Sequence, residues 1–161
     1  MAIDPLLKLL AQKARYSHQE LADLLSLSEA EVAAKMTEYE ANGTILGYQT
    51  VINPELAGCT NVSAFIEVKL TPERDGGFDR VAMRIAKFDQ VDACYLMSGG
   101  YDLNVVVTGA DLLEVARFVS EKLSTIEGVV STATHFKLKT YKKNGLLYSV
   151  EQHEGRLSVA P

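Results

Sequence analysis

Two helix starts of the same kind, eleven residues apart, constrain the fold of this chain more than any other feature. Ser17 is followed three residues later by Glu20, and Ser28 by Glu31. In this pattern the serine hydroxyl accepts a bond from a free N–H of the first turn, and the glutamate bonds back to the serine N–H. Apolar residues then recur at helical spacing after each serine, namely Leu21, Leu24 and Leu25, then Val32, Met36 and Tyr39. The sequence therefore predicts two short consecutive helices.

The connection between these helices is too short for anything but a tight corner. It consists of Ser26–Leu27, and Asn42–Gly43 ends the second helix because glycine tolerates the left-handed conformation found at helix ends. This is the pattern of a helix-turn-helix, whose second helix commonly enters the major groove of DNA. Asp4 and Pro5 predict a preceding helix, with a buried stripe of Ile3, Leu6, Leu7, Leu10 and Ala14. Together these segments form a three-helix bundle.

The second half of the chain repeats a strand–helix–strand pattern. Pro54–Thr60 separates it from the bundle, after an extended segment over Thr44–Asn53 that is expected to form a short linking strand. The predicted order is strand Asn61–Leu70, helix Phe78–Phe88, strands Val91–Met97 and Tyr101–Thr108, helix Leu112–Leu123 capped by Asp111, and strand Val129–Tyr141. The helix stripe is expected to be Leu112, Leu113, Val115, Ala116, Val119 and Leu123. This βαββαβ order is ferredoxin-like.

The predicted fold class is therefore α+β, with an N-terminal helix-turn-helix domain and a ferredoxin-like domain. The expected divisions are the helical domain with its linking strand at 1–53, a linker at 54–60, the α/β domain at 61–141 and a tail at 142–161. For residues 149–161 of the tail, SVEQHEGRLSVAP, both a mobile end and a final edge strand remain open.

One face of the predicted sheet has no helix to cover it. Phe65, Tyr101 or its neighbours, and Val106 are expected on that face. Because homodimers are the commonest assembly, a second subunit is the expected cover.

Composition indicates an ordinary globular protein of 161 residues with a formal net charge of −5. No apolar run approaches the length of a membrane span, and the N-terminus lacks the pattern of a signal peptide, so a cytoplasmic protein is expected. Cys59 and Cys94 show no metal-ligand spacing and are expected to be buried free thiols. No metal or cofactor is predicted.

The arrangement resembles the Lrp/AsnC (feast/famine) family of transcriptional regulators. The resemblance is carried by LADLLSLSEAEV, GTILGYQTVINPELAG and MSGGYDLNVVV, and it extends from Asp4 to about Tyr141. It implies a DNA-binding regulator whose second domain senses a small molecule, usually an amino acid. It also implies self-association into dimers and then into tetramers or octamers.

Two positions depart from the family pattern. The recognition helix of relatives usually carries several basic residues, whereas Lys35 is the only one between Ser28 and Gly43, and Thr37, Glu38 and Ala41 stand where arginine is frequent. In the family a Gly-Asp-aromatic-Asp sequence commonly follows the second strand of the sheet. Here Gly99, Gly100, Tyr101 and Asp102 lack its first acid.

The candidate DNA contacts lie on the two helices of the helix-turn-helix. They are Ser17, His18, Ser28, Ala30, Lys35, Thr37 and Asn42, with Ser17 and His18 placed to meet a phosphate through free N–H groups. The alternative is an acidic, solvated face on a bundle that has kept its fold and lost DNA binding. Binding through so few cations is expected to be weak per dimer.

The candidate effector site is the turn Ser98-Gly99-Gly100-Tyr101-Asp102. Its glycines allow close approach of a ligand carboxylate to backbone N–H groups, Asp102 can hold an ammonium group, and Tyr101 can cover the ligand. Thr132, Thr134 and the loop Thr71–Gly77 are weaker candidates for its walls. The alternative is a plain hairpin turn, for which Gly-Gly is a favoured pair.

Catalysis finds little support in the sequence. His18, His135 and His153 lie in no nucleophile motif, and His135 reads as a structural or interface residue. Two alternatives to the DNA-binding regulator remain. One is an amino-acid sensor or oligomeric interaction protein without DNA binding, and the other is an enzyme like the siroheme decarboxylases, which share this architecture.

Overall fold

The computed structural model describes residues 3–72 and 77–148. The chain divides into two compact units, Met1–Ile52 and Asn53–Pro161, which we describe separately. The expected linker at 54–60 lies inside the second unit.

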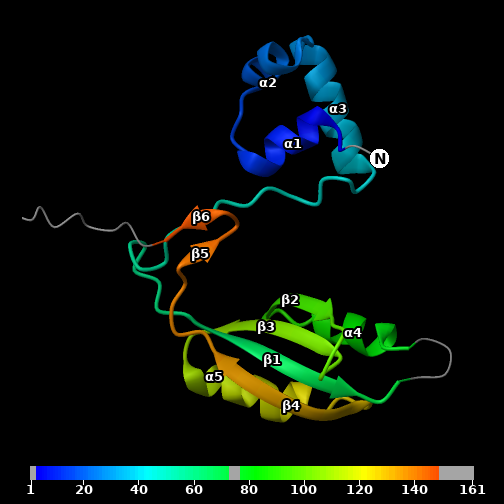
Figure 1. Cartoon of the computed structure of the whole chain (residues 1–161), viewed down its shortest axis with the longest axis vertical. Helices are drawn as coiled ribbons and strands as arrows, with labels where there is room; N and C mark the ends of the chain where they lie inside the picture. The colour runs from blue at the N-terminus through cyan, green and yellow to red at the C-terminus, as the bar shows by residue number, and fades with distance from the viewer. Residues whose placement is uncertain (1–2, 73–76, 149–161) are drawn as a thin grey trace, which may run out of the picture. The chain divides into compact units, whose positions relative to one another are not determined.

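The first unit contains three helices, α1 (Pro5–Gln12), α2 (His18–Leu25) and α3 (Glu29–Ala41) (Figure 1). Each begins at the residue that the sequence predicts. Asp4 caps α1, and the serine and glutamate bond reciprocally at the starts of α2 and α3. Ser26 adopts a left-handed conformation with φ of 55°, which turns the chain sharply between α2 and α3. The predicted helix-turn-helix is confirmed.

The core of this unit is formed by Leu6, Leu10, Leu21, Ala22 and Val32. The predicted stripe of α1 is thus right for Leu6 and Leu10 but wrong at its ends. Ile3 precedes the cap and is 61% exposed, and Ala14 is exposed because α1 ends at Gln12. The predicted strand over Thr44–Asn53 is also wrong, because that segment has no ladder partner within the described chain.

The second unit is an antiparallel sheet with helices on one face (Figure 1). The elements are β1 (Val62–Leu70), α4 (Asp79–Ala86), β2 (Val91–Leu96), β3 (Leu103–Gly109), α5 (Leu112–Arg117), the π-helical turn η1 (Phe118–Leu123) and β4 (Val129–Phe136). The strand order β2-β3-β1-β4 confirms the ferredoxin-like prediction.

Alternation along the central strands builds the core of this unit. Ile66, Val68 and Leu70 of β1 pack with Leu103, Val105 and Val107 of β3 against the helices. The helix residues in this core are Val81, Ile85, Phe118 and Leu123.

The predicted stripe of the second helix is wrong at Ala116, which is exposed, and at Leu112 and Leu113, which are 56% and 57% exposed. Leu113 lies two residues from buried Val115, about 200° around the helix and therefore on its other side. Leu112 lies in the first turn, just after the cap Asp111.

The last predicted strand is shorter than expected. β4 ends at Phe136, and Lys137 N–H donates one more bond to Ser63 O. The strand cannot extend further because its partner β1 begins at Val62. The chain then forms a small hairpin of β5 (Lys142–Lys143) and β6 (Leu146–Leu147). This hairpin lies at the start of the predicted tail, and the two alternatives expected for residues 149–161 fall outside the described residues.

The prediction for the cysteines is half right. Both are free, but Cys59 is exposed, whereas burial raises the pKa of the half-buried Cys94 thiol. Within residues 3–72 and 77–148, no helix is both long and apolar enough to cross a bilayer.

Candidate functional site

The exposed face of α3 is lined by small side chains. Ala30, Ala34, Thr37 and Ala41 recur at helical spacing and are all exposed, while Val32 is fully buried. Glu29, Glu31, Glu38 and Glu40 flank this face. The backbone of α3 can therefore approach a partner closely, but its flanks carry negative charge.

The single cation of α3 is paired with a carboxylate of α1's cap. Lys35 Nζ lies 3.1 Å from Asp4 Oδ2, and the Tyr39 hydroxyl donates to the same oxygen at 2.9 Å. Asp4 thereby accepts from two side chains of α3 while its Oδ1 caps α1 through Leu6 N–H at 2.8 Å. This network ties the start of α1 to the middle of α3.

The network also shifts the pKa values of its members. Partial burial by itself would raise the pKa of the Asp4 carboxyl, but bonds from Leu6, Lys35 and Tyr39 outweigh this effect and lower it. The hydrogen bond to Asp4 and its charge raise the pKa of Lys35, and the bond to Asp4 raises that of Tyr39. Lys35 is therefore charged and paired.

The helix starts, which were candidate phosphate contacts, already carry carboxylates. Glu20 accepts from Ser17 N–H at 2.7 Å and Glu31 from Ser28 N–H at 2.8 Å, and these bonds lower the pKa of both glutamates. The Ser28 hydroxyl also donates to Glu31 at 2.7 Å. His18 is exposed in the first turn of α2.

The remaining candidates on α3 are separated along the helix. The exposed Thr37 hydroxyl donates to Ala33 O at 2.9 Å, and Asn42 caps the C-terminal end of α3 while accepting from Thr44 N–H at 2.9 Å. Asn42 thus lies at the opposite end of α3 from Ser28 and Ala30.

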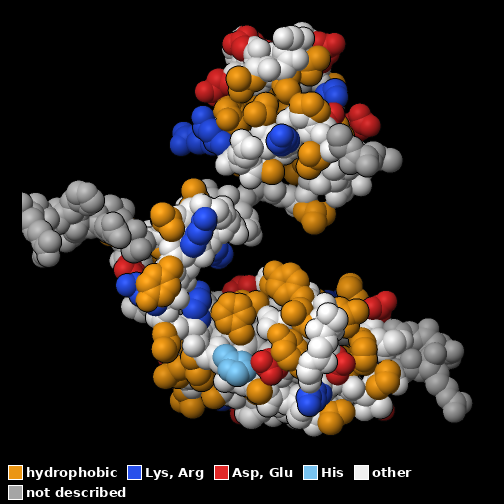
Figure 2. All heavy atoms as spheres, viewed as in Figure 1, with side chains coloured by type: hydrophobic (Ala, Val, Ile, Leu, Met, Phe, Trp, Pro, Cys, Tyr) orange, Lys and Arg blue, Asp and Glu red, His pale blue; other side chains and the backbone are white. Residues whose placement is uncertain are grey.

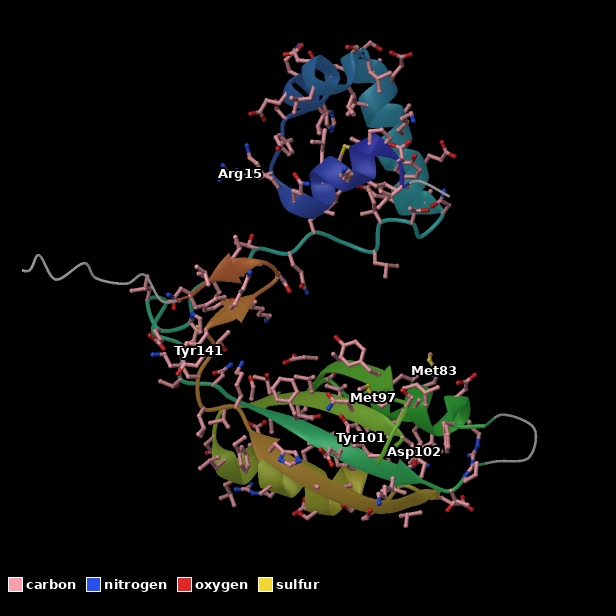
Figure 3. All side chains as sticks on the ribbon, viewed as in Figure 1. Arg15, Met83, Met97, Tyr101, Asp102 and Tyr141 are labelled. Carbon is pink, nitrogen blue, oxygen red and sulfur yellow. The ribbon has the colours of Figure 1, made fainter. Side chains whose placement is uncertain are left out.

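Arg15 is a cation that our sequence analysis did not select. It lies in the connection between α1 and α2, is exposed and projects away from the helices (Figure 3). Its neighbour Lys13 lies 4.0 Å from Glu20 and 4.4 Å from the centre of the Tyr16 ring. Arg15 lies two residues before Ser17, which caps α2, and this closeness to the start of a predicted DNA-binding helix could have marked it as a candidate contact.

The effector turn is closed at its base. Met97 N–H donates to Asp102 O at 2.8 Å, and Asp102 N–H donates to Val68 O at 3.0 Å. Asp102 Oδ2 accepts from Leu70 N–H at 2.7 Å, at the bulge where β1 changes register against β4. One carboxylate oxygen of Asp102 is therefore used by the fold.

The tip of the turn is open. Ser98, Gly99 and Gly100 are exposed, and Gly99 has a φ of 137°, which favours glycine. A Cβ added at Gly100 would meet nothing within 4 Å. Tyr101 is half-buried beside the tip. Exposed backbone, the Asp102 carboxylate and the Tyr101 ring are therefore neighbours within this turn.

The weaker wall candidates are set back from the turn. Thr132 pairs with Val68, which pairs with Leu103, so Thr132 lies about 10 Å from Leu103 across two strand spacings. Its hydroxyl lies 3.4 Å from that of Ser124. Thr134 lies two residues further along β4, opposite Ile66. In the loop Thr71–Gly77, residues 73–76 lie outside the described chain.

The sheet face opposite the helices carries apolar side chains. Phe65 is opposite Val106 on β3, and Tyr95 on β2 is 55% exposed. Figure 2 shows hydrophobic side chains gathered on the surface of this unit. Glu67 Oε1 lies 3.3 Å from His135 Nε2 on the same face. Tyr101 is half-buried in the turn before β3 rather than on a strand of this face.

Comparison with known proteins gives a family match and relatives that cover most of the chain. The Lrp/AsnC ligand binding domain matches residues 63–147. The HTH-type transcriptional regulator YugG of Bacillus subtilis is 41% identical over 97% of this chain and 95% of its own length. A proline dehydrogenase transcriptional activator of Rhizobium radiobacter is 27% identical over 88% of this chain and 90% of its own.

Solved structures share the fold. The leucine response regulatory protein LrpA of Mycobacterium tuberculosis has a TM-score of 0.72 and 24% identity, covering 91% of this chain and all (100%) of its own. A transcriptional regulator of Neisseria meningitidis, solved as a complex with L-Met, has a TM-score of 0.68 and 23% identity. That match covers 88% of this chain and 94% of the other.

Proposed function

This chain belongs to the Lrp/AsnC family of transcriptional regulators, and we propose that it binds DNA through α2 and α3 and responds to an amino acid at the turn 98–102. The observation that carries the proposal is the doubly capped helix-turn-helix, with the small-residue face of α3 turned outward. Alanine and threonine side chains leave room for α3 to lie deep in a major groove and can contact thymine methyl groups.

The mechanism of DNA contact follows from the groups that remain available. The N–H groups of the first residues of α2 and α3 have no partner within their helices and can donate to phosphates. Arg15 adds an exposed cation next to α2. Few charges take part, so each dimer binds weakly and several dimers together reach useful affinity through effective concentration.

The proposed effector is an amino acid because the turn offers one group for each end of it. Exposed backbone at Gly99 and Gly100 suits a carboxylate, and the second oxygen of Asp102 suits an ammonium. The regulator of Neisseria meningitidis solved with L-Met supports this class of ligand.

Self-association is part of the proposal. The apolar sheet face around Phe65 and Tyr95 is the kind of surface that a soluble chain covers with a partner. A second copy, packed through the same face, is the partner that we propose.

One observation favours a second candidate, a sensor that no longer binds DNA. Lys35 is paired with Asp4, and glutamates occupy the starts of both helices, so α3 offers no unpaired cation of its own. In that case the turn 98–102 would still bind an amino acid and the chain would still self-associate, but the protein would bind no DNA.

The test is a titration of the intact oligomer against the DNA upstream of its own gene at low salt, with and without each amino acid. Specific binding that an amino acid changes supports the proposed regulator. If amino acids bind but no DNA does, even at low salt, the second candidate is correct.

A further inference from the structure

The densest positive charge of the chain lies outside the helix-turn-helix. Residues 137–143, here called the basic segment, contain Lys137, Lys139, Lys142 and Lys143. No Asp or Glu occurs from Gly128 to Val150, although the whole chain has a net charge of −5. An acidic protein thus carries one concentrated basic stretch.

The basic segment is held by the fold. Lys137 N–H donates to Ser63 O at the end of β4, and Lys142 and Lys143 form β5 of the terminal hairpin. Tyr148 N–H donates to Tyr141 O, and Asn53 Nδ2 donates to Tyr148 O at 3.2 Å. Figure 2 shows Lys and Arg side chains gathered over this hairpin.

The ammonium groups of the segment are available to a partner. All four lysines are exposed, and none forms an ion pair with another residue of the described chain. Lys139 Nζ lies 5.2 Å from the centre of the Tyr141 ring. In the helix-turn-helix, by contrast, Lys35 is paired with Asp4 and Lys13 lies near Glu20.

The neighbouring aromatic side chain suits the same partner. Tyr141 is 66% exposed, and its hydroxyl can donate to a phosphate oxygen as tyrosines do at DNA backbones. Four like charges make self-pairing of two such segments unfavourable, because like charges repel. The chemistry indicates a polyanion.

We propose that the basic segment binds the phosphodiester backbone of duplex DNA without reading its sequence, and that it supplies positive charge that α3 lacks. The inference rests on the proposed function for the choice of DNA among polyanions. In this arrangement α3 discriminates between sequences and the basic segment provides affinity, a division of roles common at protein–DNA interfaces.

The experiment measures binding of the intact protein to two labelled duplexes, its own upstream region and a scrambled sequence, across a range of salt concentrations. Lys142→Gln/Lys143→Gln removes two charges per chain from the segment. Arg84→Gln/Lys87→Gln removes two exposed charges on and after α4 and is the matched control. The salt slope is the steepness with which the logarithm of affinity falls as the logarithm of salt concentration rises. Each lost phosphate contact makes this slope shallower by about 0.9, and at 0.1 M salt the affinity falls roughly tenfold.

The expected result is a loss of at least about tenfold with the Lys142/Lys143 variant on both duplexes, and a shallower salt slope. The control variant keeps wild-type binding. Equal binding of the two variants would overturn the inference. It is also overturned if light scattering shows that the Lys142/Lys143 variant changes the oligomer and this change accounts for the whole loss, since the segment would then be a subunit contact.

A third variant separates this inference from the proposed function. Ala30→Glu/Thr37→Glu places two charges on the exposed face of α3. It should remove the preference for the upstream region while binding to the scrambled duplex through the basic segment persists. An unchanged preference would count against α3 as the reading helix and leave the basic segment supported.

Discussion

Lys35 Nζ lies 3.1 Å from Asp4 Oδ2, so the only cation of α3 is bound to the residue that caps α1. Both side chains are partly exposed, 41% for Lys35 and 26% for Asp4. A pair of this kind contributes little to stability, typically about 0.2–1 kcal/mol. Its larger consequence is that Lys35 is occupied unless a stronger anion, such as a DNA phosphate, competes with Asp4.

The variant Asp4→Asn should therefore strengthen DNA binding while slightly weakening the fold. Asparagine caps a helix about as well as aspartate, so α1 keeps its start, whereas the oxygen that accepts from Lys35 and Tyr39 is replaced by an amide NH2 that cannot accept. We expect the free energy of unfolding to fall by no more than about 1 kcal/mol. The freed Lys35 should steepen the salt dependence of DNA binding by up to about 0.9 per chain.

The control for this variant is Asp4→Ala, which removes the cap as well as the charge. Loss of a cap costs roughly 0.5–2 kcal/mol, so this variant should be the less stable of the two. Unchanged DNA affinity and salt slope in Asp4→Asn would show that Lys35 does not reach DNA.

The helical unit should lose stability in acid. Hydrogen bonds hold the pKa values of Asp4, Glu20 and Glu31 below their ordinary values of 3.8, 4.5 and 4.5. The folded unit therefore keeps these carboxylates charged at a pH where the unfolded chain protonates them. Their contribution is complete above the ordinary values and is lost as pH falls through the lower folded values.

Helical circular dichroism with urea at several pH values between about 5 and 2 measures this loss. The triple variant Asp4→Asn/Glu20→Gln/Glu31→Gln keeps all three caps, because glutamine can replace glutamate in the capping box. It should show a flatter dependence on pH. A dependence equal to that of the wild type would assign the acid sensitivity to other groups.

The sheet face around Phe65 should hold a dimer. Light scattering at micromolar concentration should give at least twice the chain mass of 17.6 kDa. Phe65→Glu should shift the population toward monomer, because it places a charge where apolar surface is covered. Leu112→Glu, on an exposed site of α5, should leave the mass unchanged. A single 17.6 kDa species for the wild type would contradict the proposed dimer.

Local patterns determine most of this fold, and they were readable from the sequence. The two Ser–Glu pairs act within four residues of each other, and the alternation of Ile66 and Val68 with Phe65 and Glu67 assigns the faces of β1 directly. Our sequence analysis did not predict the β5–β6 hairpin, although Asn144-Gly145 is a signal for it, since its φ values of 49° and 81° suit the tight hairpin turn that this pair favours.

Contacts between distant residues were not readable in this way. Asp4 and Lys35 are far apart in sequence, and nothing in the periodicity of either helix indicates that they meet. The same holds for Asp102, whose carboxylate appears free in the sequence but accepts from Leu70 N–H. The shortened β4 depends on where β1 begins, which is a property of the partner strand rather than of Val129–Tyr141 itself.

The contact between Asp102 and Leu70 decides how the effector site should be tested. Asp102→Ala would remove a hydrogen bond of the fold as well as the proposed ligand contact, so Asp102→Asn is the better variant because its amide oxygen can still accept. We expect it to weaken an amino-acid ligand by about 1.5–3 kcal/mol, the range for a hydrogen bond to a charged group. Calorimetry measures the loss.

Gly100→Val tests the same site through its backbone. Nothing lies within 4 Å of the added Cβ, so the fold should tolerate valine while its side chain blocks a ligand at the tip. Gly99→Ala is a useful contrast, because the φ of 137° at Gly99 makes any side chain strained. Full-strength binding in both Gly100→Val and Asp102→Asn would place the effector site elsewhere.

Restoring charge to α3 is the most direct test of DNA binding by this helix. Glu38 is exposed next to Thr37 on the outer side of α3, and the resemblance to the family places arginine at this position in many relatives. In Glu38→Arg, a carboxylate that repels the DNA phosphates is replaced by a guanidinium that attracts them. It should tighten binding to the upstream region and steepen the salt slope by about 0.9 for each new contact. Lys35→Glu should weaken binding to the upstream region and remove its preference over a scrambled duplex, since it adds a negative charge to the same helix and breaks the bond to Asp4.

Two controls make the outcome of Glu38→Arg specific. Glu127→Arg makes the same charge change at an exposed position of the second unit, and it should alter binding less than Glu38→Arg does. A scrambled duplex shows whether the gain is general or favours the upstream sequence. If the wild type binds no DNA at low salt and Glu38→Arg creates no binding, α3 is a retained structural helix and the sensor without DNA binding is the correct description. If Glu38→Arg gains more on the upstream duplex than on the scrambled one, α3 lies in the groove and its four glutamates limit the affinity of the natural protein.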